Sequence, residues 1–189
     1  MLKKILLGLA LVIVVFVIVV ATRPAEFRVV RAATIPAAPD AVFPHINDLK
    51  KWQEWSPWAK IDPNCKVAFE GPVEGSGAKF SWSGNNDVGV GTMTITESKS
   101  PDTVRIKLAF LKPMEGDSDV VLTLKPEAGG TQVTWQMDSK NGFAAKAFGL
   151  FVDCEKMCGD QFEQGFKNLK DVITKPATAA PATKATSAN

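Results

Sequence analysis

The chain has 189 residues, which is enough for one domain built around a single continuous hydrophobic core. Its formal net charge of +2 is misleading: without the four basic residues nearest the ends, 18 remain within residues 24–175 against 20 acidic residues. Those basic residues are scattered between acidic ones, which is not the pattern of a phosphate-binding face. The composition therefore argues against nucleic acid as a partner.

Residues 5–21 form an uncharged segment in which fourteen of seventeen positions are Leu, Ile, Val or Phe. Inserting these side chains into a bilayer is favourable by about 4 to 8 kcal/mol. A helix of this length spans ~26 Å, and Lys3, Lys4 and Arg23 can snorkel to the two interfaces. We expect residues 1–23 to be a transmembrane anchor, with the membrane as a partner through residues 5–21.

The main alternative for this segment is a cleaved secretory signal, for which Val19-Val20-Ala21 is a partial match to the cleavage site. The apolar run is longer than the roughly 7 to 15 residues of such signals, so we favour the anchor. Basic residues flank it on both sides, and we give most weight to the two N-terminal lysines. This predicts a single-pass protein of a bacterial inner membrane, with its domain on the extracytoplasmic side.

A strand and two short helices are predicted next. Residues 26–35 are rich in β-branched side chains, which is typical of a strand. A short helix begins at Pro39 and is expected to break at Pro44. An Asn-Asp pair at positions 47 and 48 can cap a second helix, which Pro57 ends.

Residues 66–138 predict an antiparallel meander of five or six strands, because apolar and polar positions alternate between turns rich in Gly and Pro. Polar side chains such as Lys79 and Arg105 occupy one face, so the sheet is expected to be wet on one side and buried on the other. The predicted buried face carries Ala78, Phe80, Trp82, Val104, Ile106, Leu108, Phe110, Val133, Trp135 and Met137.

Two helices are predicted to cover the buried face, an amphipathic one over residues 143–151 and a longer one over residues 153–175. The longer helix has an apolar stripe at Cys158, Phe162, Phe166, Leu169 and Ile173. It also contains Gly159 and Gly165, at a cost of ~1 kcal/mol each relative to Ala. Either a close backbone approach or open space beside the helix is expected there.

The last fourteen residues, 176–189, contain no large apolar side chain and are expected to be a disordered tail. The predicted organisation is thus an anchor over residues 1–23, one domain over residues 24–175 and this tail. Three cysteines are too few for a disulfide framework. Cys154 and Cys158 lie four residues apart on a predicted helix, where packed thiols are the simpler interpretation.

This order of elements resembles the helix-grip fold of the START-like superfamily, an α+β architecture. Four local motifs are similar to members described as polyketide cyclase/dehydrase and lipid transport proteins. They are WQEWSPW at 52–58, GVG at 89–91, GTQVTW at 130–135 and GDQFEQGFKNLK at 159–170. The resemblance implies a curved sheet wrapped around the long helix, with an apolar cavity between them. The cysteines at 154 and 158 depart from the pattern, which leaves a redox role open.

Five Trp, eleven Phe and no Tyr make the aromatic surface almost entirely apolar. For each aromatic residue, packing in an ordinary core is the alternative to lining a cavity. The residues that the resemblance makes candidates for lining the cavity are Phe80, Trp82, Phe110, Trp135, Met137, Phe162 and Phe166. Trp52, Trp55 and Trp58 are candidates for the mouth of the cavity, or for a plug beneath the short helices.

Catalytic and metal-binding motifs are weak. The single histidine, His45, has no identifiable partner, and no nucleophile elbow is present. Cys65 and the two helical cysteines lack the paired spacing of metal ligands, so no metal and no cofactor are expected. A phosphate-binding glycine loop is also lacking.

The sequence is compatible with three hypotheses for the function. The first is a membrane-tethered binding or carrier domain for a hydrophobic small molecule or lipid. The second is a cyclase or dehydratase-type enzyme, which an inward-facing pair such as Glu70 with Asp138 would favour. The third is a protein-interaction or stress-response module, which would carry an apolar patch on its exposed surface.

Overall fold

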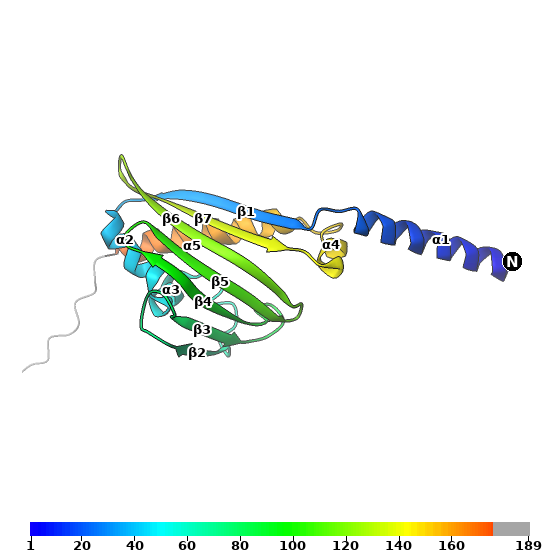
Figure 1. Ribbon diagram of the computed structural model, residues 1–189, viewed down its shortest axis with the longest axis horizontal. Coiled ribbons are helices and arrows are strands. Elements are labelled where there is room, and N and C mark those ends of the chain that lie inside the picture. Colours follow the sequence, from blue (N-terminus) through cyan, green and yellow to red (C-terminus); the bar gives the residue numbers. More distant parts are fainter. Residues whose placement is uncertain (176–189) are drawn as a thin grey trace, which may run out of the picture.

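A computed structural model of the chain describes residues 1–175 (Figure 1). The predicted tail, 176–189, lies outside the described residues. Seven antiparallel strands form one curved sheet in the order β1-β7-β6-β5-β4-β3-β2, and a long helix, α5, packs along it. The predicted α+β helix-grip architecture is confirmed.

Helix α1, Leu2–Ala21, projects from one end of the domain (Figure 1). Its twenty residues span about 30 Å at the helical rise, which matches the hydrocarbon core of a bilayer. It is the one helix within residues 1–175 that is long and apolar enough to cross a membrane, and a signal sequence would share these features. Val20, in its last turn, is its single buried residue.

Strand β1, Glu26–Ile35, leads into two short helices, α2 at Pro39–Asn47 and α3 at Leu49–Trp55. The expected break at Pro44 is wrong, because α2 continues through this proline for another turn. Buried Phe43 and Ile46 lie on either side of Pro44, so core packing holds the turn together. The Asp48 carboxylate caps α3 by accepting a hydrogen bond from the Lys50 amide at 2.8 Å, as predicted.

The meander consists of six strands, the upper number expected from the sequence. They are β2 Lys66–Glu70, β3 Lys79–Ser83, β4 Val90–Lys99, β5 Thr103–Lys112, β6 Gly116–Glu127 and β7 Gly130–Lys140. Directly opposed residues share a face, and the register places the predicted apolar positions on one side. This concave face looks toward α5, and the polar positions lie on the convex face.

The segment after β7 differs from its prediction. Helix α4, Phe143–Phe148, is shorter than expected and contains no buried residue. It therefore does not cover the sheet. Helix α5, Cys154–Thr174, covers the part of the sheet near β1 and β7, with Phe162, Phe166 and Leu169 buried and Cys158 and Ile173 partly buried against the core.

An arginine on β1 ties the helix to the sheet. Arg31 lies on the concave face and forms ion pairs with Glu155 at 2.7 Å and Glu163 at 3.1 Å, two turns apart on α5. Its guanidinium lies directly against Gly159, where a Cβ atom would overlap it. A glycine at this position therefore lets the guanidinium lie between the two carboxylates.

This arrangement predicts that Gly159→Ala changes stability by different amounts in two backgrounds. With Arg31→Ala present, the substitution should stabilise the protein by up to about 1 kcal/mol through helix propensity. In the wild-type background that gain should be reduced or lost, because the methyl group displaces the guanidinium from its partners. Urea unfolding of the four proteins measures the difference, and equal gains in both backgrounds would contradict it.

Candidate functional site

The tryptophans at the predicted cavity mouth lie beneath α5 in contact with aromatic residues of the sheet and helix. The Trp135 ring stacks on Phe162 with a centroid distance of 4.2 Å, and Trp52 meets its edge at 5.2 Å. We call this group the tryptophan cluster. It consists of Trp52, Trp55, Trp58, Trp135, Phe162 and Phe166.

Gly165 allows α5 to approach the tryptophan cluster closely. A Cβ atom at this position would lie 3.0 Å from Cζ3 of Trp135 and 3.5 Å from Trp55. Of the two possibilities predicted for the glycines of α5, close approach is therefore observed at both Gly159 and Gly165. The cluster is a packed interior wall, and contact of its members with a ligand stays a prediction.

A second aromatic group follows the concave face across β2, β3 and β5. The ring centroids of Phe69 and Phe80 are 5.3 Å apart, those of Phe80 and Trp82 are 5.8 Å apart, and those of Trp82 and Phe110 are 5.7 Å apart. We call these four residues the aromatic row. The Trp82 ring lies over Gly91 on the neighbouring strand, where a Cβ atom would approach it to 2.5 Å.

The aromatic row differs from the tryptophan cluster in its access to solvent. Phe69 is 38% exposed and Phe110 is 37% exposed, and Val67, opposite Trp82 in the register, is 53% exposed. Exposed apolar groups on a concave surface are typical of ligand sites. Phe80, Trp82 and Phe110 were predicted from the sequence, whereas Phe69 was missed, although its alternation with Val67 marks it as facing the same side.

Met137 lies on β7, two residues after Trp135 of the tryptophan cluster, and is half-buried and opposite Val29 and Val120 in the register. The next inward-facing position on its strand holds Ser139. The Ser139 hydroxyl lies 2.6 Å from that of buried Ser118, so the two share a hydrogen bond. This hydroxyl pair places a polar group on the concave face, besides Arg31, and no sequence motif marks it.

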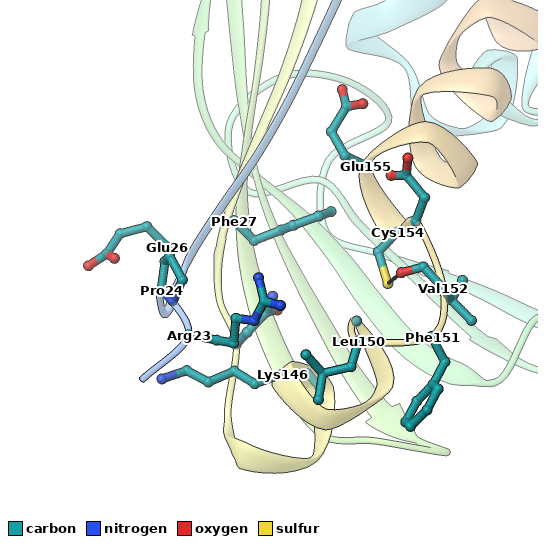
Figure 2. A pocket seen from close by; sticks show the side chains of 14 residues that line it. Arg23, Pro24, Glu26, Phe27, Lys146, Leu150, Phe151, Val152, Cys154 and Glu155 are labelled. Atoms are coloured by element: carbon teal, nitrogen blue, oxygen red, sulfur yellow. Dashed lines mark hydrogen bonds between the residues drawn. The ribbon is translucent and has the colours of Figure 1, made fainter. Parts of the chain in front are cut away.

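A pocket of about 490 Å³ lies at the end of the domain nearest α1. Its wall is formed by the start of β1, by α4 and by the connection to α5, with the Phe27 ring extending across it (Figure 2). Arg23 and Lys146 lie together on the side where the chain leaves α1, and Leu150 lies below (Figure 2). Sequence reasoning missed this pocket, because its lining comes from loop positions without periodicity.

The groups considered for catalysis do not converge. Glu70 pairs with Lys79 and Asp138 pairs with Arg28, and both carboxylates lie on the convex face of different strands. The inward pair that would have favoured an enzyme is therefore not formed. His45 is half-buried, and its Nδ1 atom has no hydrogen-bond partner among residues 1–175.

The three cysteines are free thiols within residues 1–175. Burial, with help from the nearby Cys154 and Glu155, raises the pKa of Cys158, which disfavours the reactive thiolate. In the same part of the chain, no three His, Cys, Asp or Glu side chains gather in a way that could hold a metal ion.

The sequence of the domain matches a known protein family. Residues 26–174 match the family described as polyketide cyclase / dehydrase and lipid transport. Among curated proteins, no sequence matches the chain.

Solved structures share the fold at low identity. A protein of Chromobacterium violaceum is 15% identical with a TM-score of 0.57, and the match covers 82% of this chain and 100% of that one. A protein of Mesorhizobium loti is 17% identical with a TM-score of 0.58, covering 79% and 100%. The Aha1 dimer of Colwellia psychrerythraea is 15% identical with a TM-score of 0.55, covering 78% and 96%.

The tight contact at Gly165 predicts that Gly165→Ala is destabilising. Alanine favours the helix by about 1 kcal/mol relative to glycine. The surrounding rings leave the Trp135 ring no room to move away from the added methyl group, and such overpacking costs about 1 to 3 kcal/mol. We expect a net loss of up to about 2 kcal/mol in thermal or urea unfolding. Lys167→Ala, at an exposed position on the same helix, is the control and should leave stability nearly unchanged.

Burial lowers the pKa of His45 below its ordinary value of 6.5. The unfolded chain therefore binds a proton more readily than the folded one, and the free energy of unfolding should fall as the pH drops below about 6.5. His45→Asn should remove this part of the pH dependence. Urea unfolding between about pH 7 and pH 5 tests it, and identical slopes for the two proteins would contradict it.

Proposed function

Since the chain belongs to the polyketide cyclase/dehydrase and lipid transport family, we propose that it is a membrane-anchored binding or carrier domain for a hydrophobic small molecule or lipid. The observation that supports this most directly is the aromatic row. Its apolar side chains lie on the concave face of the sheet, and Phe69 and Phe110 at its two ends are accessible to solvent.

The chemistry of the concave face suits an apolar ligand. Phe69 and Phe110 offer hydrocarbon surface, and the indole N–H of Trp82 is already donated to the Val88 carbonyl at 2.9 Å. Burial of such surface is favourable by roughly 25 cal/mol per Å². The Ser118–Ser139 hydroxyl pair can receive a single polar group of the ligand. In this proposal, the tryptophan cluster is the wall that closes the site beneath α5.

Helix α1 supports the proposal of a membrane location through its length and its composition. All of its residues except Val20 are partly or fully exposed, so the domain does not bury this helix. A hydrocarbon environment would cover the apolar surface that is left. We propose an uncleaved anchor, with the domain on the extracytoplasmic side as the flanking lysines suggest.

The proposal predicts that shortening the aromatic row weakens ligand binding. Phe69→Ser and Phe110→Ser should each lower the affinity of the domain for an apolar fluorescent probe such as a dansyl fatty acid. A loss on the order of tenfold is expected for each, because about 1.4 kcal/mol of apolar contact corresponds to that factor. The assay uses the chain from residue 24 onward, whose fold is checked by its near-ultraviolet circular dichroism.

Val30→Ser provides the matched control. Val30 is 41% exposed, similar to the two phenylalanines, but lies on the convex face of β1. It should leave probe binding unchanged. Equal losses in all three variants, or no probe binding and no lipid in native mass spectra of the wild type, would overturn the proposal.

A further inference from the structure

The segment that connects β7 to α5 presents phenylalanines to the surroundings rather than to the core. Phe143 is 51% exposed, Phe148 is 46% exposed, and Phe151 is 80% exposed. They lie within nine residues of one another, and none of the residues of α4 is buried. We call residues 142–152 the interface segment. Three neighbouring exposed phenylalanines are unusual on a surface that faces only water. Such apolar patches mark sites that bind a partner or a membrane.

The charges of the interface segment narrow the choice of partner. No acidic residue occurs between Lys140 and Val152, whereas Lys146 lies at the centre of α4. Apolar rings beside a basic side chain are typical of segments that lie in the headgroup layer of a membrane. The nearest acidic residues in the sequence, Asp153 and Glu155, follow the segment at the start of α5. A protein partner would not require this one-sided charge.

The position of the interface segment points to the same partner. α4 contacts α1, and Val20 in the last turn of α1 is completely buried. Figure 1 shows α4 beside the point where α1 joins the domain, while α2 and α3 lie at the opposite end. A helix that crosses a bilayer and ends at Ala21 brings this end of the domain to the bilayer surface. The segment thus lies where headgroups meet acyl chains.

We propose that the interface segment is embedded in the surface of the bilayer that α1 spans. Phe143, Phe148 and Phe151 insert among the acyl chains, and Lys146 and Arg23 lie among the phosphates. This inference rests on the proposed membrane anchoring, and it adds a second point of attachment. Two attachments fix the tilt of the domain, which a single helix followed by a short link would leave free.

The pocket behind the interface segment gives this attachment a role in ligand transfer. Its wall includes Leu150, Val152 and Phe27, and Phe27 is the register partner of Ser139 on the concave face. With the segment embedded, the pocket opens at the headgroup layer. The pocket then lies between the headgroup layer and Ser139 of the concave face, with the charged side chains of Arg23, Lys146 and Glu155 also in its lining.

Site-specific photocrosslinking of the full-length chain tests the proposal. Benzoylphenylalanine is placed singly at Phe148, at Phe151, at Val12 within α1 and at Val73, which is 70% exposed. Val73 belongs to the β2–β3 loop, whose Gly75 amide bonds to the Asn47 carbonyl of α2, so it lies at the end far from α1. Each protein is reconstituted into vesicles of phosphatidylethanolamine and phosphatidylglycerol, irradiated, and examined for lipid adducts by mass spectrometry.

Adducts at Val12, Phe148 and Phe151, with none above background at Val73, are the expected result. Adducts at Val12 alone would show that α1 is inserted while the interface segment is not, which overturns this inference and leaves the anchoring intact. No adduct at Val12 would overturn both. Unchanged tryptophan fluorescence in each variant confirms that the fold is retained.

Discussion

The close contact between α5 and the Trp135 ring is the constraint on which the other features of the domain depend. Gly165 brings the helix backbone against this ring, and Arg31 holds the preceding turns through Glu155 and Glu163. Both contacts attach α5 to the half of the sheet formed by β1 and β7. Because the helix is fixed there, its apolar stripe packs against the tryptophans of the cluster and not against the far strands.

A single helix cannot cover a sheet of this width. Seven strands at about 4.8 Å spacing extend over about 29 Å, whereas a helix with its side chains is about 10 to 12 Å across. The strands beyond its reach therefore keep apolar side chains that the described chain covers only in part, and these include Phe69 and Phe110 of the aromatic row. The accessible surface proposed as a ligand site follows from how the helix is held. Its position beyond the reach of α5 is a property of the fold, and its aromatic character is a property of this sequence.

Much of the fold could be predicted because periodicity reports directly on burial. The alternation at Phe80 and Trp82 and the stripe at Phe162 and Phe166 each identified the correct face. Rules based on local sequence failed where tertiary contacts determine the structure. Helix α2 continues through Pro44 because the residues on either side of this proline are buried in the core. The prediction that α4 covers the sheet was wrong, because amphipathic spacing does not reveal which surface the apolar side meets. The pocket could not be predicted, since it depends on how three connecting segments meet.

The sheet order has a consequence for how the protein is made. β1 is synthesised directly after α1, but it is an edge strand whose neighbour is β7, and about a hundred residues separate the two. Until β7 leaves the ribosome, the amide groups of β1 have no strand to bind, while the meander from β2 onward can pair between sequence neighbours. Joining β1 to β7 closes the longest loop in the sheet, so this step carries the largest chain-entropy cost of any strand pairing. The first strand made is thus the last to be paired.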